Sequence, residues 1–104
     1  MVSTVGDVGG WPIRLSDERW GHIVRRHPEM RAERARVLET VSQPHYILEG
    51  DRGTLMAVRL YDRTPLTRKH CVVVYRRIGL SDGFVVTAYF TSSTARWRRA
   101  VWPA

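Results

Sequence analysis

The sequence predicts an α+β domain in which two N-terminal helices pack on one face of a four-stranded antiparallel sheet. Helical spacing of apolar residues is confined to the first half of the chain, strand-like runs fill the second half, and the segments joining these runs are short. Because the two kinds of element are segregated along the chain, an alternating α/β arrangement is not expected. The length of 104 residues suits a single domain, since domains commonly hold about 100 to 150 residues.

The first elements are a leader, a short strand and the start of a helix. Residues 1–10, rich in glycine and valine, are expected to form a loose leader, and the alternation in "WPIRL", residues 11–15, predicts a strand. Ser16 is the expected N-cap of the first helix. Asp17 and Glu18 follow it, and acidic side chains stabilise the first turn of a helix.

Two helices are expected before residue 45. The first carries one inward stripe at positions i, i+3, i+4 and i+7, and Pro28 should end or offset it. A second helix is predicted over residues 29–41, and Pro44 should stop it. The residues of the first stripe are Trp20, Ile23, Val24 and His27.

Beyond residue 45 the apolar period becomes that of strands. Four β-rich runs are separated by "DRG", "RTPLTR" and "IGLSDG", and such short connections favour an antiparallel meander. The runs are "HYILEG", "TLMAVRLYD", "KHCVVVYRR" and "GFVVTAYFTS". Cys71, the only cysteine, lies in the third run and is expected to pack in the core, because it has no disulfide partner.

Alternation within two runs predicts a polar sheet face. Met56, Val58 and Leu60 form the apolar side of one run. If this side and the apolar side of the last run both face the helices, the uncovered face carries hydroxyl groups and one cation. That set is Arg59, Tyr61, Thr87, Tyr89 and Thr91. The alternative is a half-exposed sheet in which threonine and tyrosine occur only for their β-propensity.

The charge of the chain predicts a polyanionic partner. Net charge is +7 and the pI is about 10.7. Arginine supplies 16 of the 17 basic residues, and its planar fork of donors suits phosphate. Nucleic acid is therefore the leading inference, and solubility alone is the alternative. No run reaches the roughly 20 apolar residues of a membrane span, and no signal peptide is recognised, so we expect a cytoplasmic protein without membrane partners, or a domain delivered into a target cell as part of a larger toxin.

The stretch "HIVRRH" places His22 and His27 about 140° apart around a helix axis, so the two rings are not expected to bind one metal ion. A histidine, a tyrosine and an arginine are instead suited to cleaving RNA without a metal or other cofactor. The alternative for His27, which extends an apolar stripe, is a hydrogen-bonded core residue. The basic tail "TARWRRAVWPA" is expected to be a short helix or mobile, with Trp97 and Trp102 either stacking on bases or closing the core.

The order of "RWGHIVRRHPEM", "VLETVSQPHYIL", "VVVYRR" and "VVTAYFTS" over roughly residues 13–94 resembles the phage and polymorphic-toxin branch of the barnase, EndoU, colicin and RelE-like ribonuclease superfamily. The resemblance implies a helix pair on a four-stranded antiparallel sheet whose open face receives RNA. It also implies metal-independent cleavage by a toxin that an antitoxin or immunity protein restrains. The motif residues that it points to are His22, His27, Arg26, Thr87, Tyr89 and Thr91; Arg59 rests on strand position alone.

The resulting hypothesis is an endoribonuclease that leaves 2′,3′-cyclic phosphate and 5′-hydroxyl ends. His27, or failing it His22, would be the base, and Tyr89 or the other histidine would be the acid. Arg26 and Arg59 would bind the scissile phosphate, which Thr87 and Thr91 would orient. Further RNA contacts are expected from Arg25, Tyr61, Lys69, Arg96, Arg98 and Arg99. The alternatives are a RelE-like module that binds nucleic acid or protein without turnover, and a DNA-directed nuclease or a toxin with another target.

Overall fold

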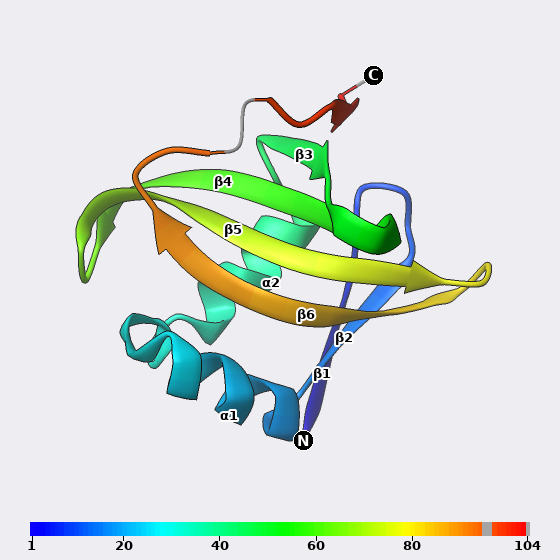
Figure 1. Cartoon of the computed structure of the whole chain (residues 1–104). Coiled ribbons are helices and arrows are strands. Elements are labelled where there is room, and N and C mark those ends of the chain that lie inside the picture. The colour runs from blue at the N-terminus through cyan, green and yellow to red at the C-terminus, as the bar shows by residue number, and fades with distance from the viewer. Residues whose placement is uncertain (95–96, 104) are drawn as a thin grey trace.

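The computed structural model describes residues 1–94 and 97–103 and shows one seven-stranded sheet (Figure 1). The strand order is β1-β2-β6-β5-β4-β3-β7, and every neighbouring pair is antiparallel except β2 and β6, which run parallel. The strands are β1 (Val2–Gly6), β2 (Pro12–Ser16), β3 (Tyr46–Glu49), β4 (Leu55–Thr64), β5 (Thr67–Ile78), β6 (Asp82–Thr91) and β7 (Ala100–Trp102).

The prediction of a four-stranded antiparallel sheet is wrong. The meander β3–β4–β5–β6 is present, but β1, β2 and β7 enlarge it to a mixed sheet of seven strands. The expected loose leader, residues 1–10, instead contains β1, which pairs with β2 from Val2 to Gly6. The basic tail likewise contains β7, which pairs with β3. Both are edge strands, and edge strands owe their order to a neighbour rather than to an apolar pattern of their own.

The two helices take different positions on this sheet. The first, α1 (Asp17–Arg26), begins as predicted, because the Ser16 hydroxyl accepts a hydrogen bond from the Arg19 amide at 3.0 Å. The second, α2 (Arg34–Ser42), follows a short 3₁₀ helix, η1 (Pro28–Met30), and so starts later than predicted.

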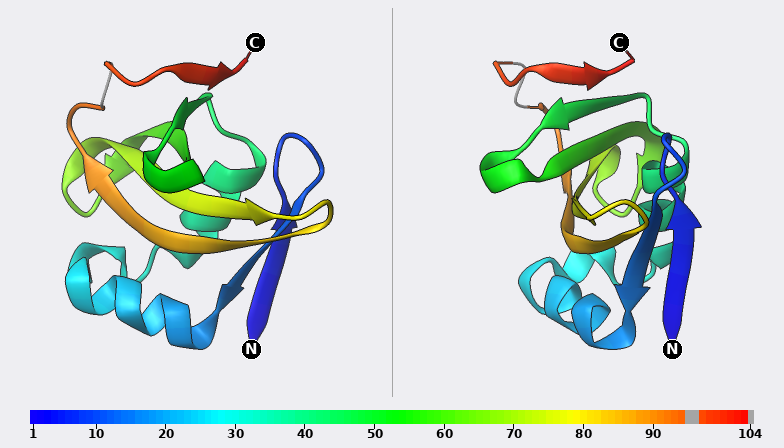
Figure 2. Two further views of the ribbon diagram at one scale, coloured as in Figure 1. Left: turned by 45° about the vertical axis from the view of Figure 1, so that its right-hand side comes forward. Right: turned by 90° about the vertical axis from the view of Figure 1, so that its right-hand side faces the viewer.

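Only α2 covers the middle of the sheet, where it packs against β4, β5 and β1, whereas α1 packs against β6 and β2 (Figures 1 and 2). We call the face that α2 leaves uncovered the open face. The main core lies between α2 and the sheet and includes Ile13, Val37, Val41 and Val73, all fully buried. A smaller apolar cluster of Leu48, Val58 and Val72 lies on the opposite side of the sheet, with the half-buried Tyr89 packed against it.

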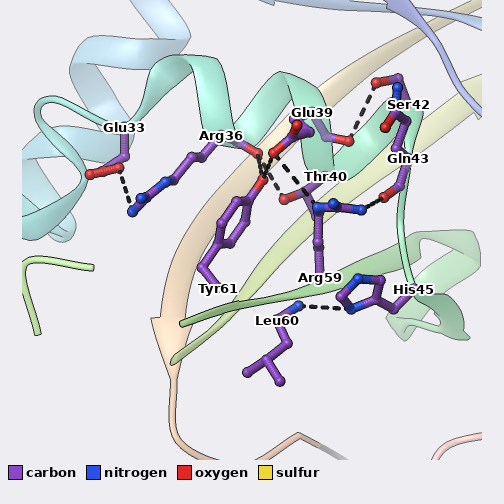
Figure 3. Close-up of polar contacts among 10 residues, drawn as sticks. All are labelled: Glu33, Arg36, Glu39, Thr40, Ser42, Gln43, His45, Arg59, Leu60 and Tyr61. Carbon is purple, nitrogen blue, oxygen red and sulfur yellow. Dashed lines mark hydrogen bonds and ion pairs between the residues drawn. The ribbon is translucent and has the colours of Figure 1, made fainter. Parts of the chain in front are cut away.

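Arg59 and Tyr61 face α2, so their predicted place on the open face is wrong. Cross-strand partners share one face of a sheet, and Arg59 pairs with Cys71, which lies in the main core. Met56 and Val58 consequently face the other way, toward the small cluster. The Arg59 guanidinium donates to the carbonyl oxygen of Gln43, the C-cap of α2, at 2.6 Å (Figure 3).

The reason for this inversion is the polar end of α2. The last carbonyl groups of a helix have no intrahelical donor, and a cation there also complements the helix dipole. The Tyr61 hydroxyl adds a second link, because it donates to the Glu39 carboxylate at 2.5 Å and to the Arg36 carbonyl oxygen at 3.3 Å (Figure 3). Arg59 and Tyr61 thus stabilise α2 on the sheet.

A β-bulge in β6 changes which residues of that strand face the core. Val74 pairs with Thr87 and Tyr75 pairs with Val85, which leaves Val86 as an extra residue between them. Val85 is therefore buried in the main core, contrary to the simple alternation, and Val86 lines the surface beside Thr87. Tyr89 lies on the open face, as the sequence predicted.

Cys71 is buried in the main core, and burial raises the pKa of its thiol to about 11. Because the thiolate is the reactive form, we expect the native protein to resist alkylation by iodoacetamide at pH 8. In urea the same thiol should react quickly. Mass spectrometry of samples quenched over time measures the two rates; equal rates would show that β5 opens freely in the native protein.

Candidate functional site

A pocket of about 430 Å³ lies between α1 and β6. Five of the side chains that the sequence proposed as a site line it together: His22, Arg26, His27, Thr87 and Tyr89. The remaining lining residues are Arg19, Ile23 and Val86. The structure thus brings an imidazole of the first helical segment to the hydroxyl-bearing side chains of β6. The His27 and Tyr89 rings lie 5.6 Å apart between centroids, with their planes tilted by 34°.

The helix α1 and its end place the basic groups of the pocket. Arg19, His22 and Arg26 stand at positions i, i+3 and i+7, so they share one side of the helix. His27 follows as the C-cap, with φ −133° and ψ 76°, and therefore leaves the helical path. Pro28 disfavours helical backbone at the preceding residue, which accounts for this break. The predicted stripe made His27 a continuation of the helix, but the break is what turns it toward Tyr89.

His27 has a carboxylate on one side of its ring. Its Nδ1 lies 3.6 Å from Glu29 Oε1, and the two side chains are 31% and 23% exposed. A carboxylate beside Nδ1 favours the tautomer that carries its hydrogen there. The Nε2 atom is then left with a free lone pair and can accept a proton.

His22 has the opposite arrangement. The Arg25 Nη2 atom lies 2.8 Å from His22 Nδ1. A guanidinium group only donates hydrogen bonds, so this nitrogen of His22 must be the acceptor and the ring hydrogen must sit on Nε2. The pocket therefore combines one imidazole with a free lone pair at Nε2 and another that can donate a hydrogen bond from Nε2.

Tyr89 supplies a protonated hydroxyl. Its ring is half-buried against the small apolar cluster, and burial raises the pKa of the phenol, an effect that the charge of Arg98 partly opposes. The hydroxyl is therefore protonated at neutral pH and can donate a hydrogen bond, and it can give its proton only to a stronger base such as a departing alkoxide.

The pocket is positively charged. Arg19 and Arg26 both line it, and no aspartate or glutamate is among its lining residues. Arg19 Nη1 donates to the Val86 carbonyl oxygen at 3.5 Å, which draws its guanidinium over β6. Among the described residues Arg26 has no side-chain hydrogen bond or ion pair, so its donors are available to a ligand.

The proposed catalytic residues Arg59 and Thr91 and the proposed RNA-binding residue Tyr61 lie elsewhere. Arg59 and Tyr61 bind α2 on the other face of the sheet. Thr91 is on the strand that holds Thr87, but four residues further on, or about 13 Å along an extended strand. Its hydroxyl donates to the Ser93 carbonyl oxygen at 2.7 Å, so it stabilises the turn after β6.

The proposed RNA-binding residues are dispersed. Arg25 contacts His22, and Lys69 donates to the Ser92 hydroxyl. Arg98 forms an ion pair with Asp51 at 2.9 Å, and Arg99 forms one with Glu49 at 3.0 Å. The proposed contact of Arg96 lies outside the described residues.

Two residues of the site were missed from the sequence. Arg19 was detectable, because it precedes His22 by three positions and Arg26 by seven, the spacing of one helix face. Glu29 was assigned to a second helix, whereas it belongs to the 3₁₀ helix after Pro28, which brings it to the ring of His27. No simple sequence period marks that turn.

Comparison with protein-family models, with curated proteins and with solved structures gives no match for this chain. The residues that the structure describes contain no group of three His, Cys, Asp or Glu side chains placed to hold a metal ion. They also contain no helix with the length and apolar character needed to cross a membrane.

Proposed function

We propose that the protein is a metal-independent endoribonuclease, of the toxin kind that its motifs resemble, acting on cytoplasmic RNA. The single observation that carries this proposal is the pocket between α1 and β6, where two imidazoles, a tyrosine hydroxyl and arginines meet. These groups supply the three requirements of cleavage by an internal 2′-hydroxyl: a base, an acid and stabilisation of the charge that grows on phosphorus.

The hydrogen positions on the two imidazole rings suggest which chemical role each of them takes in cleavage. His27 Nε2 takes the proton of the 2′-hydroxyl, and O2′ then forms a bond to phosphorus. Arg26 and Arg19 stabilise the negative phosphorane oxygens. The bond from phosphorus to the 5′-oxygen breaks, and that oxygen receives a proton from the Tyr89 hydroxyl. The neutral His22 ring, whose Nδ1 accepts from Arg25, would donate a hydrogen bond from Nε2 to a phosphorane oxygen. The products are a 2′,3′-cyclic phosphate and a 5′-hydroxyl.

Thr87 lines the same pocket, and its hydroxyl would orient the phosphate. Arg19 takes the place that the sequence hypothesis gave to Arg59, because Arg59 is engaged with α2. Glu29 would hold the His27 ring and stabilise the imidazolium that forms, as a carboxylate does for a catalytic histidine in hydrolases. An antitoxin or immunity protein that covers this pocket is part of the same proposal.

Incubation of the protein with end-labelled RNA in EDTA tests this function. We expect cleavage in EDTA, products with 2′,3′-cyclic phosphate ends, and no cleavage at a position that carries a single 2′-deoxy substitution. The matched control is DNA of the same sequence, which should remain intact.

Four outcomes would contradict the proposal. Binding of RNA without cleavage under any condition would favour the non-catalytic module. Cleavage that requires added metal, or that proceeds across the 2′-deoxy position, would overturn the transesterification mechanism. Equal cleavage of DNA would assign the protein to DNA-directed nucleases.

A further inference from the structure

A second pocket, of about 360 Å³, adjoins the first. The two pockets share Val86 and Tyr89, so the Tyr89 side chain stands between them. The second pocket lies between β4, β5, β6 and the turn before β4. Its lining residues are Asp51, Arg52, Thr54, Met56, Val74, Arg76, Val86, Tyr89 and Arg98.

The second pocket combines an apolar floor with a basic rim. Met56 and Val74 are partly exposed and pack with Tyr89 on this side of the sheet. Three arginines and one aspartate line the pocket, so its charge is positive. This combination suits a nucleotide, whose base has an apolar face and whose phosphate is an anion.

Two of the three arginines are available to a ligand. Arg98 is engaged by Asp51 at 2.9 Å and stacks on Trp97, with its guanidinium carbon 4.5 Å from the ring centroid. In the described part of the chain, Arg52 and Arg76 make no side-chain hydrogen bond or ion pair. Arg52 is exposed in the turn η2 (Asp51–Gly53), and Arg76 projects from β5.

We propose that the second pocket is a subsite for the nucleotide adjacent to the cleaved phosphate in single-stranded RNA. The base would lie on Met56 and Val74 beside Tyr89, and Arg52 and Arg76 would hold its phosphate. The inference rests on the proposed function. Bases reach such separate hollows only when they leave a helical stack, so single-stranded RNA is preferred to duplex.

Binding of a labelled oligonucleotide that cannot be cleaved tests this subsite. The probe is a fluorescent single-stranded 2′-O-methyl octamer, and fluorescence anisotropy gives its Kd as a function of salt. We expect Arg76→Gln and Arg52→Gln each to raise the Kd about tenfold. Each variant should also lower the slope of log Kd against log salt by about 0.7, the value for one phosphate contact on a single strand.

The matched control is Arg63→Gln, which removes the same charge from an exposed position near the far end of β4. Arg63 is seven residues from Met56, or about 23 Å along the strand. Its substitution should change the Kd less than twofold and should leave the salt slope unchanged. Unaltered melting temperatures of all three variants show that the differences arise from binding.

The subsite is overturned if Arg76→Gln and Arg63→Gln weaken binding equally, or if the wild-type protein does not bind the octamer. It is also overturned if a duplex binds as tightly as the single strand, or if polyglutamate of equal charge displaces the octamer equally well, because the pocket would then suit an acidic protein. If Arg76→Gln selectively weakens binding of the octamer but the protein cuts no RNA, the second pocket is still a nucleotide-binding subsite, and only the proposed nuclease activity is overturned.

Discussion

Replacing His27 by glutamine is expected to lower the rate of RNA cleavage by a factor of about 10² to 10⁴, the usual contribution of a general base. Glutamine retains a polar group of similar size but cannot take a proton from the 2′-hydroxyl. The protein should still bind RNA, because Arg19 and Arg26 keep their positions on α1. Single-turnover cleavage of a labelled oligonucleotide in EDTA measures the rate, and anisotropy with the 2′-O-methyl octamer measures binding.

His45→Gln is the matched control for this experiment. His45 is exposed, and its Nδ1 accepts a hydrogen bond from the Leu60 amide at 3.1 Å, away from the pocket residues. Its substitution should leave the cleavage rate within about twofold of the wild type, as surface changes away from a site usually do. If His27→Gln cleaves as fast as His45→Gln, His27 is not the base, and His22→Gln then becomes the decisive variant.

Replacing Asp7 by alanine is expected to lower the free energy of unfolding by about 3 kcal/mol, because it removes a fully buried carboxylate that accepts from a partly exposed arginine and from three further donors. The Asp7 side chain is fully buried at 0% exposure, and its Oδ2 accepts from Arg77 Nε at 2.7 Å. It also accepts hydrogen bonds from the Tyr75 hydroxyl and from the amides of Gly9 and Trp11. Alanine would leave all four donors without this acceptor.

Urea denaturation followed by tryptophan fluorescence measures this loss. The comparison holds if the m-value, the slope of the free energy of unfolding against urea concentration, is the same in the variant and the wild type. Asp82→Ala is the control, because Asp82 also pairs with an arginine, Arg14 at 2.9 Å, but is 47% exposed. An exposed ion pair contributes little to stability, so the control should lower the midpoint far less. Equal losses in the two variants would show that Asp7 does not hold the β1–β2 hairpin on the sheet.

The sequence predicted those parts of the fold that depend on local chemistry. The Ser16 cap and the acidic residues after it mark the start of α1, and the four apolar runs with short turns mark the meander. The edge strands β1 and β7 were not predictable in this way. The strand β7 is ordered by pairing with β3, which is distant in sequence. The strand β1 pairs with β2, and the buried Asp7 after it links this hairpin to β5. Neither edge strand leaves a periodic apolar pattern.

The candidate site likewise contains some residues that the sequence could predict and others that it could not. His22 and Arg26 share a face of α1 because helical spacing places them there, so their meeting was open to sequence reasoning. The face of Arg59 was misassigned, because alternation defines two faces without saying which one is covered. Arg59 faces α2, because the carbonyl groups at the end of that helix need a hydrogen-bond donor. Glu29 depends on the irregular turn after Pro28 and has no such signal.

The extra residue Val86 shifts the alternation of inward-facing and outward-facing residues in β6 by one position. Upstream, odd-numbered Val85 enters the core, whereas downstream even-numbered Ala88 and Phe90 do so. If Val86 were instead accommodated in an uninterrupted pleat, Val85 and Tyr89 would share one face, because they are four positions apart, and Val85 could not be buried while Tyr89 faced outward. The bulge at this one amino acid thus lets the strand bury Val85 near its beginning and turn Tyr89, also odd-numbered, to the open face nearer its end.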